Sequence, residues 1–574
     1  MNEKSNSKCL SLATVSILGQ PPSTTEDPIA IFNKLPFAVD ENSFNQWFRD
    51  LDKANKAQTF KLLFSTLHVM AKEDMPARSR FLFVQKLSLL SGKISEELQQ
   101  TYKRKHFPFS REDRLTLELS ARCAMEISRN YAQLCDDYDF KANNLFTRQQ
   151  KAFILFDAIQ AQTKVLLYRS LIYEKPKKGF WHSCYLFYLS AKKNDVINLA
   201  IEGKRSSFIN KFKQLLMFEL SNVQQFTTEE ILAVFRLLNN VSDQVCLLTK
   251  VPEKKYKGVP SLDLRKDEPP ALVDREDEQG QPYIFYISAI SAIKRLIEAL
   301  SNKKIPADCN KSMFLRLIKT LSMNQQRKTD RELASGELFA VIGFDEIEAF
   351  IIDNKKKADG YIDKVPDDDM GGLKSDLIQK VDVGSHRLTI DDFRNDKQAN
   401  FAIISGDIGG IDEVTNTEIW GSQNQLLEEQ EQNKKPVENA EFLDKSTTGF
   451  QLCLKDEKLA IKVGDIVGLI MPETLVITVV RRIIQALETE TLVGVETLGN
   501  FSDLLHIINT DNKGAIWVLY LNSNEETESI VIKTTDFNNE AYLFADNNEK
   551  ITKYRVEKQL NASAMMKHLK VSQC

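Results

Sequence analysis

Several features that would indicate a metal centre, a disulfide framework or a membrane span are missing from this sequence. The eight cysteines are scattered without a C-x-x-C pair, and the six histidines form no H-E-x-x-H motif. That distribution is typical of reduced thiols and predicts no metal site. No apolar run reaches the roughly 18 to 20 residues that a spanning helix requires. The first thirty residues also lack a basic-then-apolar signal pattern. We therefore expect a cytoplasmic protein without a membrane span.

A strong charge of one sign is also absent. The 574 residues carry a net charge of −4, with 42% hydrophobic and 27% charged residues. This balance is ordinary for a soluble globular protein and gives no overall attraction to DNA, so we expect no DNA partner. The phosphate-loop pattern G-x-x-x-x-G-K-[ST], the nucleophile pattern G-x-S-x-G and the G-G-D-E-F type of cyclase signature do not occur. An enzyme is therefore the least favoured class, and we expect neither catalytic residues nor a cofactor.

The N-terminal part has helical periodicity. We expect a flexible N-terminus over 1–39 and an all-helical domain over 40–250. Thr227 and Glu230 have the spacing of a capping box, and apolar residues follow them at helical intervals. The segment 153–173 is apolar on most sides, which predicts a central helix.

Two further segments separate the helical part from a region of strands. Residues 251–325 contain a charged stretch with four prolines and then a helical pattern, which indicates a linker and a connecting helix. Residues 354–438 contain acidic clusters and little apolar periodicity. This composition predicts an acidic, disordered insertion.

After residue 440 the periodicity changes to that of short strands separated by turn residues. Alternation of this kind favours an antiparallel barrel. The predicted strands include 450–454, 475–480, 492–496, 517–520, 530–532 and 542–544, and residues 463–469 are predicted as a turn that feeds a strand. A final helix is predicted over 562–569.

Two short motifs carry the chemistry. Asp444, Ser446 and Gly449 form the pattern D-x-S-x-x-G at the start of this region, and Arg327 and Arg331 form R-x-x-x-R before an earlier predicted strand. Each motif has an ordinary alternative, because R-x-x-x-R also occurs on solvated helix faces and D-x-S-x-x-G also forms simple turns. Their order along the chain, together with the strands that follow, is more specific than either motif.

This succession of motifs and strands resembles the PilZ domain family, whose members bind the bacterial second messenger cyclic di-GMP. The resemblance covers 326–353, with R-x-x-x-R, and 439–500, with D-x-S-x-x-G; we expect a C-terminal β extension and tail over 501–574. Arg331 and Asp444 are 113 positions apart, where the family has only a strand or two. An insertion in a barrel loop explains the gap, because each doubling of loop length costs only about 0.6 kcal/mol.

The resemblance implies a role for each motif residue. Arg327 and Arg331 would clamp phosphate and guanine, since a guanidinium both donates paired hydrogen bonds and stacks on a base. Asp444, Ser446 and Gly449 would cradle the other base edge on the barrel surface. Arg481 and Arg482 are additional candidates by charge and position.

The sequence therefore predicts a multidomain α plus β protein. An N-terminal all-helical domain precedes a PilZ-like antiparallel β-barrel that the acidic insertion interrupts. The implied function is a cyclic di-GMP receptor that signals to an unknown protein partner through the helical domain. The alternative is a helical scaffold with a degenerate barrel that binds no nucleotide.

Overall fold

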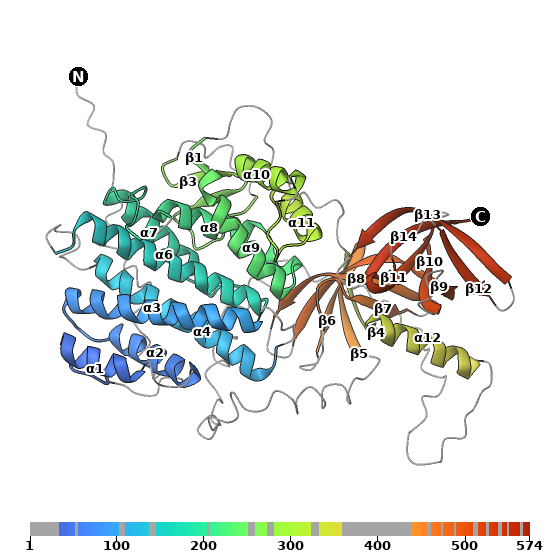
Figure 1. Ribbon diagram of the computed structural model, residues 1–574, viewed down its shortest axis with the longest axis horizontal. Coiled ribbons are helices and arrows are strands. Elements are labelled where there is room, and N and C mark those ends of the chain that lie inside the picture. Colours follow the sequence, from blue (N-terminus) through green and yellow to red (C-terminus); the bar gives the residue numbers. More distant parts are fainter. Residues whose placement is uncertain are drawn as a thin grey trace, which may run out of the picture.

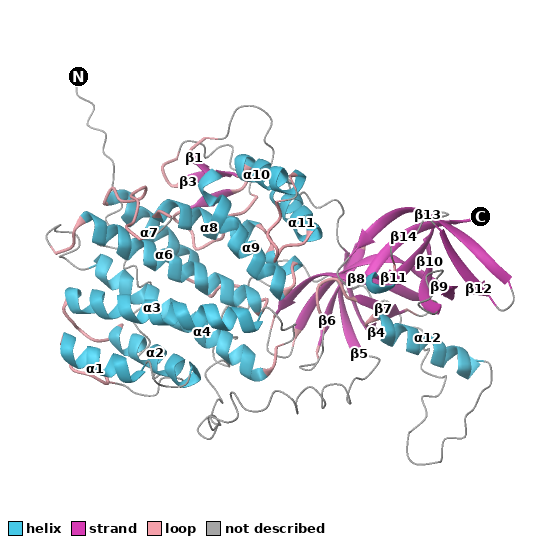
Figure 2. Cartoon of the chain, viewed as in Figure 1, coloured by secondary structure: helices cyan, strands magenta, loops and turns pink. Residues whose placement is uncertain are grey.

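The computed structural model describes a helical N-terminal part and a strand-rich C-terminal part (Figure 1). The described residues are 34–51, 56–102, 109–136, 145–203, 206–250, 259–272, 281–302, 304–322, 332–358, 438–446, 448–455, 461–471, 474–486, 490–508, 515–523, 527–537, 542–547, 550–562 and 566–574. Arg327, Arg331, most of the predicted insertion and most of the predicted flexible N-terminus lie outside these ranges. Figure 2 shows most of the helices gathered in one part of the molecule and most of the strands in the other.

The predicted helical character of the N-terminal part is confirmed. Its helices are α1 (Glu41–Leu51), α2 (Lys56–Met70), α3 (Ala77–Tyr102), α4 (Arg111–Asp136), α6 (Arg148–Leu171), α7 (Phe180–Lys193), α8 (Phe208–Leu220), the 3₁₀ turn η2 (Val223–Gln225), α9 (Thr228–Val241) and the 3₁₀ turn η3 (Ser242–Gln244). Helix α6 is buried on nearly every side, as its apolar sequence predicts. The capping box of Thr227 and Glu230 is present at the start of α9, where it satisfies backbone donors that the helix cannot pair itself.

The segment expected as a linker is partly folded against the helices. Strands β1 (Cys246–Leu248), β2 (Ser261–Asp263) and β3 (Ile284–Ser288) form a small antiparallel sheet, and α10 (Ile290–Ser301) and α11 (Lys311–Ser322) follow. The ring of Phe285 packs edge-on against Tyr188 of α7, with centroids 5.6 Å apart. In the described part of this segment, short apolar strands between the prolines and charges pack against the helical core. The predicted connecting helix corresponds to α10.

The C-terminal strands pair into two closed rings, and these strands lie together on the right of Figure 1. They are β4 (Glu332–Ile342), β5 (Glu438–Ser446), β6 (Gly449–Leu454), β7 (Ile466–Ile470), β8 (Leu475–Gln485), β9 (Thr491–Ile508), β10 (Ala515–Ser523), β11 (Thr527–Lys533), β12 (Tyr542–Asn547), β13 (Lys550–Ala562) and β14 (Met566–Gln573), with the 3₁₀ turn η6 (Thr534–Asp536) after β11. We call the ring β4–β5–β6–β9–β8–β7 the first barrel and the ring β9–β10–β11–β14–β13–β12 the second barrel. All pairings are antiparallel.

Strand β9 belongs to both barrels. Its first part pairs with β6 and β8, and its last part pairs with β10 and β12. Each described strand of the two rings thus has neighbours on both sides, and closure removes the sheet edges that would otherwise invite aggregation. The helix that follows β4, α12 (Phe344–Ala358), packs Ile347 and Ile351 against the outer surface of the first barrel.

Three apolar clusters organise the molecule. The interior of the first barrel is continuous with the core of the helical part. A second cluster fills the space between the two barrels and under α12, and a third forms the interior of the second barrel. The helical part and the first barrel therefore share one core, which fixes the orientation of the barrel.

The predicted helix over 562–569 is wrong. Residues 550–562 belong to β13, and β14 begins at Met566, paired with β11 and β13. Leu569 and Val571 point into the second barrel, while Met566 and His568 face outward. The side chains therefore alternate between the two faces, as they do in a strand. In so short a segment, pairing with neighbouring strands outweighs local propensity.

No helix in the described part of the chain is long and apolar enough to cross a membrane. Within the same ranges, no cluster of three or more histidine, cysteine, aspartate or glutamate side chains is arranged to hold a metal ion.

Candidate ligand-binding site

The D-x-S-x-x-G motif forms the hairpin between β5 and β6 of the first barrel. Asp444 and Ser446 end β5, and Gly449 begins β6. The Ser446 hydroxyl donates a hydrogen bond to the Gly449 carbonyl, 3.1 Å away. On the other side of the hairpin, the Thr497 amide of β9 donates to the Thr448 carbonyl at 2.9 Å. The hairpin is therefore fixed both internally and against β9.

Gly449 is required by close packing rather than by an unusual backbone angle. It pairs with Glu496 of β9, and a Cβ atom built at this position would lie 2.0 Å from the Val495 carbonyl oxygen. Real Cβ contacts are never so short, so only glycine allows β6 and β9 to approach this closely here.

A row of residues crosses the outer face of the barrel from the motif to β8. Asp444 pairs with Gln451 of β6, Gln451 pairs with Gly494 of β9, and Gly494 pairs with Arg482 of β8. The Arg482 guanidinium donates to the Gln451 side-chain oxygen at 2.7 Å. Asp444 and Arg482 therefore stand at the two ends of one polar row.

Gly494 makes room for this arrangement. A Cβ atom at Gly494 would lie 2.7 Å from Cγ of Arg482, so the arginine side chain lies across the glycine. Gly494 and Gln451 were not among the site residues predicted from the sequence. The signal was present, because a glycine inside the strand-like run V-G-V-E marks the close approach of another group.

Arg481 lies beside this row in a different setting. The ladder between β8 and β9 shifts register between Val480 and Arg482, so Arg481 is the extra residue of a bulge. Its Nε donates to Glu496 at 2.5 Å, and both side chains are partly exposed. The two arginines expected as additional candidates thus have separate partners, Gln451 and Glu496.

Strand β4, which follows the R-x-x-x-R motif in the sequence, pairs with the strand that carries Asp444 and Ser446. Glu332, the first described residue after the motif, pairs with Lys445, and the next residue, Leu333, pairs with Asp444. The long sequence gap before the D-x-S-x-x-G motif therefore does not keep the first described residues of β4 away from that motif. Arg327 and Arg331 themselves lie outside the described residues.

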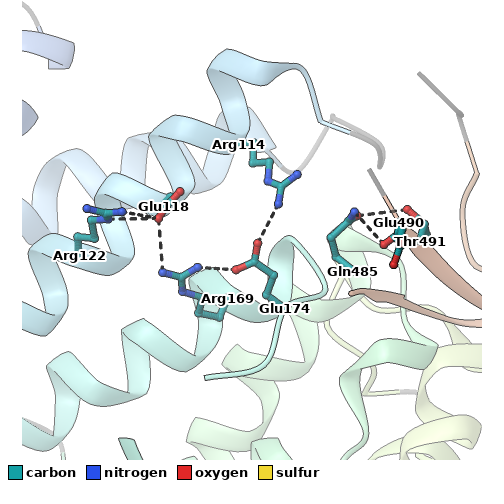
Figure 3. A network of polar contacts seen from close by, with 8 residues as sticks. All are labelled: Arg114, Glu118, Arg122, Arg169, Glu174, Gln485, Glu490 and Thr491. Carbon is teal, nitrogen blue, oxygen red and sulfur yellow. Dashed lines mark hydrogen bonds and ion pairs between the residues drawn. The ribbon is translucent and has the colours of Figure 1, made fainter. Parts of the chain in front are cut away.

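The far end of β8 contacts the helical part, because the Gln485 amide donates to the Tyr173 carbonyl at 3.2 Å. The Gln485 side chain bonds to the Glu490 carbonyl and the Thr491 hydroxyl (Figure 3). Tyr173 is buried, has a left-handed backbone with φ of 57°, and donates its hydroxyl to the Phe226 carbonyl at 2.8 Å. Burial, and then the charge of Glu230, raise the pKa of the Tyr173 hydroxyl well above its usual value.

A charged network surrounds this contact on the helical side (Figure 3). Glu174, next to Tyr173, accepts from Arg114 at 3.1 Å and from Arg169. Arg169 also approaches Glu118 at 3.8 Å, and Glu118 accepts from Arg122 at 2.9 Å. Burial opposes ionisation of Glu118, but Arg122 and Arg169 prevail and lower the pKa of its carboxyl. The loop that carries Tyr173 is therefore tied to α4 and α6 by ion pairs.

Comparison with known proteins identifies both parts of the chain. Residues 42–253 match the family model described as "Cyclic-di-GMP receptor FimW, N-terminal domain", and residues 263–502 match "Cyclic-di-GMP receptor FimW, middle PilZ domain". Searches of curated proteins and of solved structures found no match. The predicted resemblance is confirmed: this chain belongs to the family of PilZ-type cyclic di-GMP receptors.

Proposed function

We propose that cyclic di-GMP binds on the outer face of the first barrel, between the R-x-x-x-R segment and the D-x-S-x-x-G hairpin, and that β8 transmits binding to the helical part. The observation that carries the proposal is the pairing of Leu333 with Asp444. It brings the chain that leaves Arg331 to the strand that ends in Asp444 and Ser446, as one shared ligand requires.

The roles follow from the chemistry of the ligand, which has two phosphodiesters and two guanines. Arg327 and Arg331 bind phosphate oxygens and the O6 and N7 edge of guanine, and their planes stack on the bases. Asp444 accepts hydrogen bonds from guanine N1–H and N2–H. Ser446 holds the hairpin in shape, and Gly449 keeps it close to β9.

Arg482 connects this site to the helical part. It lies at one end of the polar row on the barrel face and three residues before Gln485 on β8, which is roughly 10 Å along a strand. A ligand that draws Arg482 or Asp444 out of the row changes the forces on β8. The Gln485–Tyr173 hydrogen bond lies at the end of that strand and conveys the change to the helices.

The protein is proposed to signal by binding cyclic di-GMP and a protein partner. The protein acts as a binding protein without turnover of the nucleotide, in the cytoplasm, where this second messenger is made and read. The helical part engages a protein partner. Its supporting feature is the set of exposed leucines on its surface, Leu82, Leu89 and Leu115.

Calorimetry of the full chain with cyclic di-GMP tests the site. We expect binding by the wild type and a loss of roughly ten-fold or more in affinity for Arg327→Ala and for Asp444→Ala, because each removes charge-assisted hydrogen bonds. Arg555→Ala on β13 and Asp546→Ala on β12 are matched controls in the second barrel. Unchanged affinity in both site variants would contradict the assignment. A wild type that binds no cyclic di-GMP would favour the scaffold with a degenerate barrel.

A further inference from the structure

The two barrels have the same strand topology. If the strands of each ring are numbered 1 to 6 along the chain, the first barrel, β4 to β9, closes in the order 1-2-3-6-5-4. The second barrel, β9 to β14, closes in that same order, again with every pair antiparallel. Strand β9 is therefore the last strand of one barrel and the first strand of the next. The second barrel is a topological repeat of the first.

The repeat allows the ligand face of the first barrel to be located on the second. In the first barrel the hairpin of strands 2 and 3 closes at the pair Ser446–Gly449, and Asp444–Gln451 is the third pair from that end. In the second barrel the corresponding hairpin closes at Ser523–Thr527, and the third pair is Leu521–Ser529. Leu521 thus occupies the position of Asp444.

This face of the second barrel is covered. The outward residues of β10, β11 and β14, represented by Leu521, Val531 and Met566, are fully buried. They pack in one cluster with Ile477 and Val479 of β8, on the outside of the first barrel. The surface that is the ligand face in the first barrel is, in the second barrel, an apolar contact between the barrels.

The hairpin sequence of the second barrel is also unsuited to a dinucleotide. Residues 522–528 read Asn-Ser-Asn-Glu-Glu-Thr-Glu, with three carboxylates and no arginine. An acidic tip of this kind repels phosphate groups. Leucine in place of aspartate also removes the acceptor for the guanine edge.

At its border the contact between the barrels reaches Glu496, because Val479 of β8 packs in the same cluster as Met566 and is the strand partner of Glu496. His568 of β14 shares its outward face with Met566 and bonds through Nε2 to the Ser529 hydroxyl at 2.9 Å. Both side chains are buried. Burial lowers the pKa of His568 to about 4, with Glu496 opposing and Arg481 reinforcing the shift. A neutral imidazole at this place leaves Glu496 as the partner of Arg481.

We propose that the second barrel is a repeat of the PilZ barrel that no longer binds nucleotide, and that it uses its former ligand face to position the Arg481–Glu496 pair beside the functional site. The proposal rests on the proposed function for the ligand itself. Glu496 is the strand partner of Gly449 in the motif, so a shift of Glu496 would also shift the hairpin that is proposed to bind the base.

The first test asks whether the second barrel has a site of its own. Asp444→Ala in the full chain should weaken all cyclic di-GMP binding that calorimetry detects in the wild type, and no site of unchanged affinity should remain. A residual site in Asp444→Ala that is lost on substitution in 522–529 would overturn the proposal.

The second test asks whether the contact between the barrels positions the pair. We expect His568→Ala to weaken cyclic di-GMP binding roughly 2- to 30-fold without changing the stoichiometry, the range seen for residues that act through a neighbour. Lys553→Ala on the far side of the second barrel should leave affinity unchanged. Glu496→Gln breaks the ion pair with Arg481 without changing the second barrel. This variant replaces His568→Ala in the test if His568→Ala does not fold.

A double-mutant cycle separates positioning from general loosening. If His568 acts through Glu496, the double variant His568→Ala with Glu496→Gln binds no more weakly than Glu496→Gln alone. Fully additive losses, or lower thermal stability of His568→Ala with unchanged affinity, would overturn the positioning role. Absence of binding by the wild type would overturn the proposed function as well, whereas wild-type binding with unaffected variants would overturn this inference alone.

Discussion

The Gln485 amide at the end of β8 donates a hydrogen bond to the Tyr173 carbonyl, 3.2 Å away. Gln485 belongs to the first barrel, and Tyr173 belongs to the loop after α6. Tyr173 holds a left-handed backbone angle that non-glycine residues rarely adopt. Such strain persists only where surrounding contacts enforce it, and it marks this loop as a place where the two parts are held in one arrangement.

Removal of the Tyr173 hydroxyl should lower the stability of the loop that contacts β8. Tyr173→Phe leaves the Phe226 carbonyl without its donor at 2.8 Å, and we expect a loss of about 1 to 2 kcal/mol in the free energy of unfolding by urea. Tyr542→Phe is a matched control, because Tyr542 is exposed on β12. Equal stability of Tyr173→Phe and wild type would show that water replaces the lost hydrogen bond.

Alanine at Gly449 should damage the site without any loss of polar groups. The added Cβ would lie 2.0 Å from the Val495 carbonyl oxygen, so β6 and β9 must separate. We expect destabilisation by roughly 1 to 3 kcal/mol and a parallel loss of cyclic di-GMP affinity, measured by thermal unfolding and calorimetry. Gly203→Ala, where no atom lies within 4 Å, is a control for glycine replacement, although its φ of 73° adds some strain of its own. Normal ligand affinity in Gly449→Ala would separate the hairpin from binding.

Acid should destabilise the contact between the barrels. The pKa of His568 is about 4 in the folded chain, against an ordinary 6.5, so the folded state favours the neutral ring. Its stabilising contribution is fully present above pH 6.5 and is lost as the pH falls toward 4, by about 2 to 3 kcal/mol. Urea unfolding of wild type and His568→Gln across this range measures the effect. The variant should show a flatter dependence, and equal slopes would contradict the assignment.

Ionisation of Glu219 on α8 should destabilise the protein as the pH rises, whereas protonation of His568 destabilises it as the pH falls. Burial raises the pKa of its carboxyl to about 7, with Lys175 opposing. The associated stability is fully present below pH 4.5 and is lost as the pH rises through 7, because the folded state must then hold a poorly solvated charge. We expect Glu219→Gln to be about 2 kcal/mol more stable than wild type at pH 8 and to lose that advantage at pH 4. An advantage that does not change with pH would point to packing instead.

Local features of the fold could be predicted, and long-range ones could not. The capping box of Thr227 and Glu230 depends on neighbouring residues, and the structure contains it. The approach of Leu333 to Asp444 depends on pairing between distant strands, which no local pattern encodes. The helix predicted over 562–569 failed for the same reason, since β14 is a strand only because β11 and β13 flank it.

The site likewise contains residues that could be predicted from a local motif and residues that only the strand register reveals. The sequence indicated Asp444, Ser446 and Gly449 because their spacing forms a motif. Gln451 and Gly494 join the polar row through the register of β6 and β9, and residue type alone does not reveal that register. Arg481 and Arg482 were chosen by charge, but only the bulge in β8 shows that they have different partners.

The shared strand β9 has a consequence for dissecting the protein. The match to the middle domain ends at residue 502, inside a strand that runs without interruption from Thr491 to Ile508. A chain that ended there would leave Leu498 and the outer face of β8 without their apolar cover. The two barrels should therefore melt in a single cooperative transition, and shortened versions should be soluble only when they extend through β14.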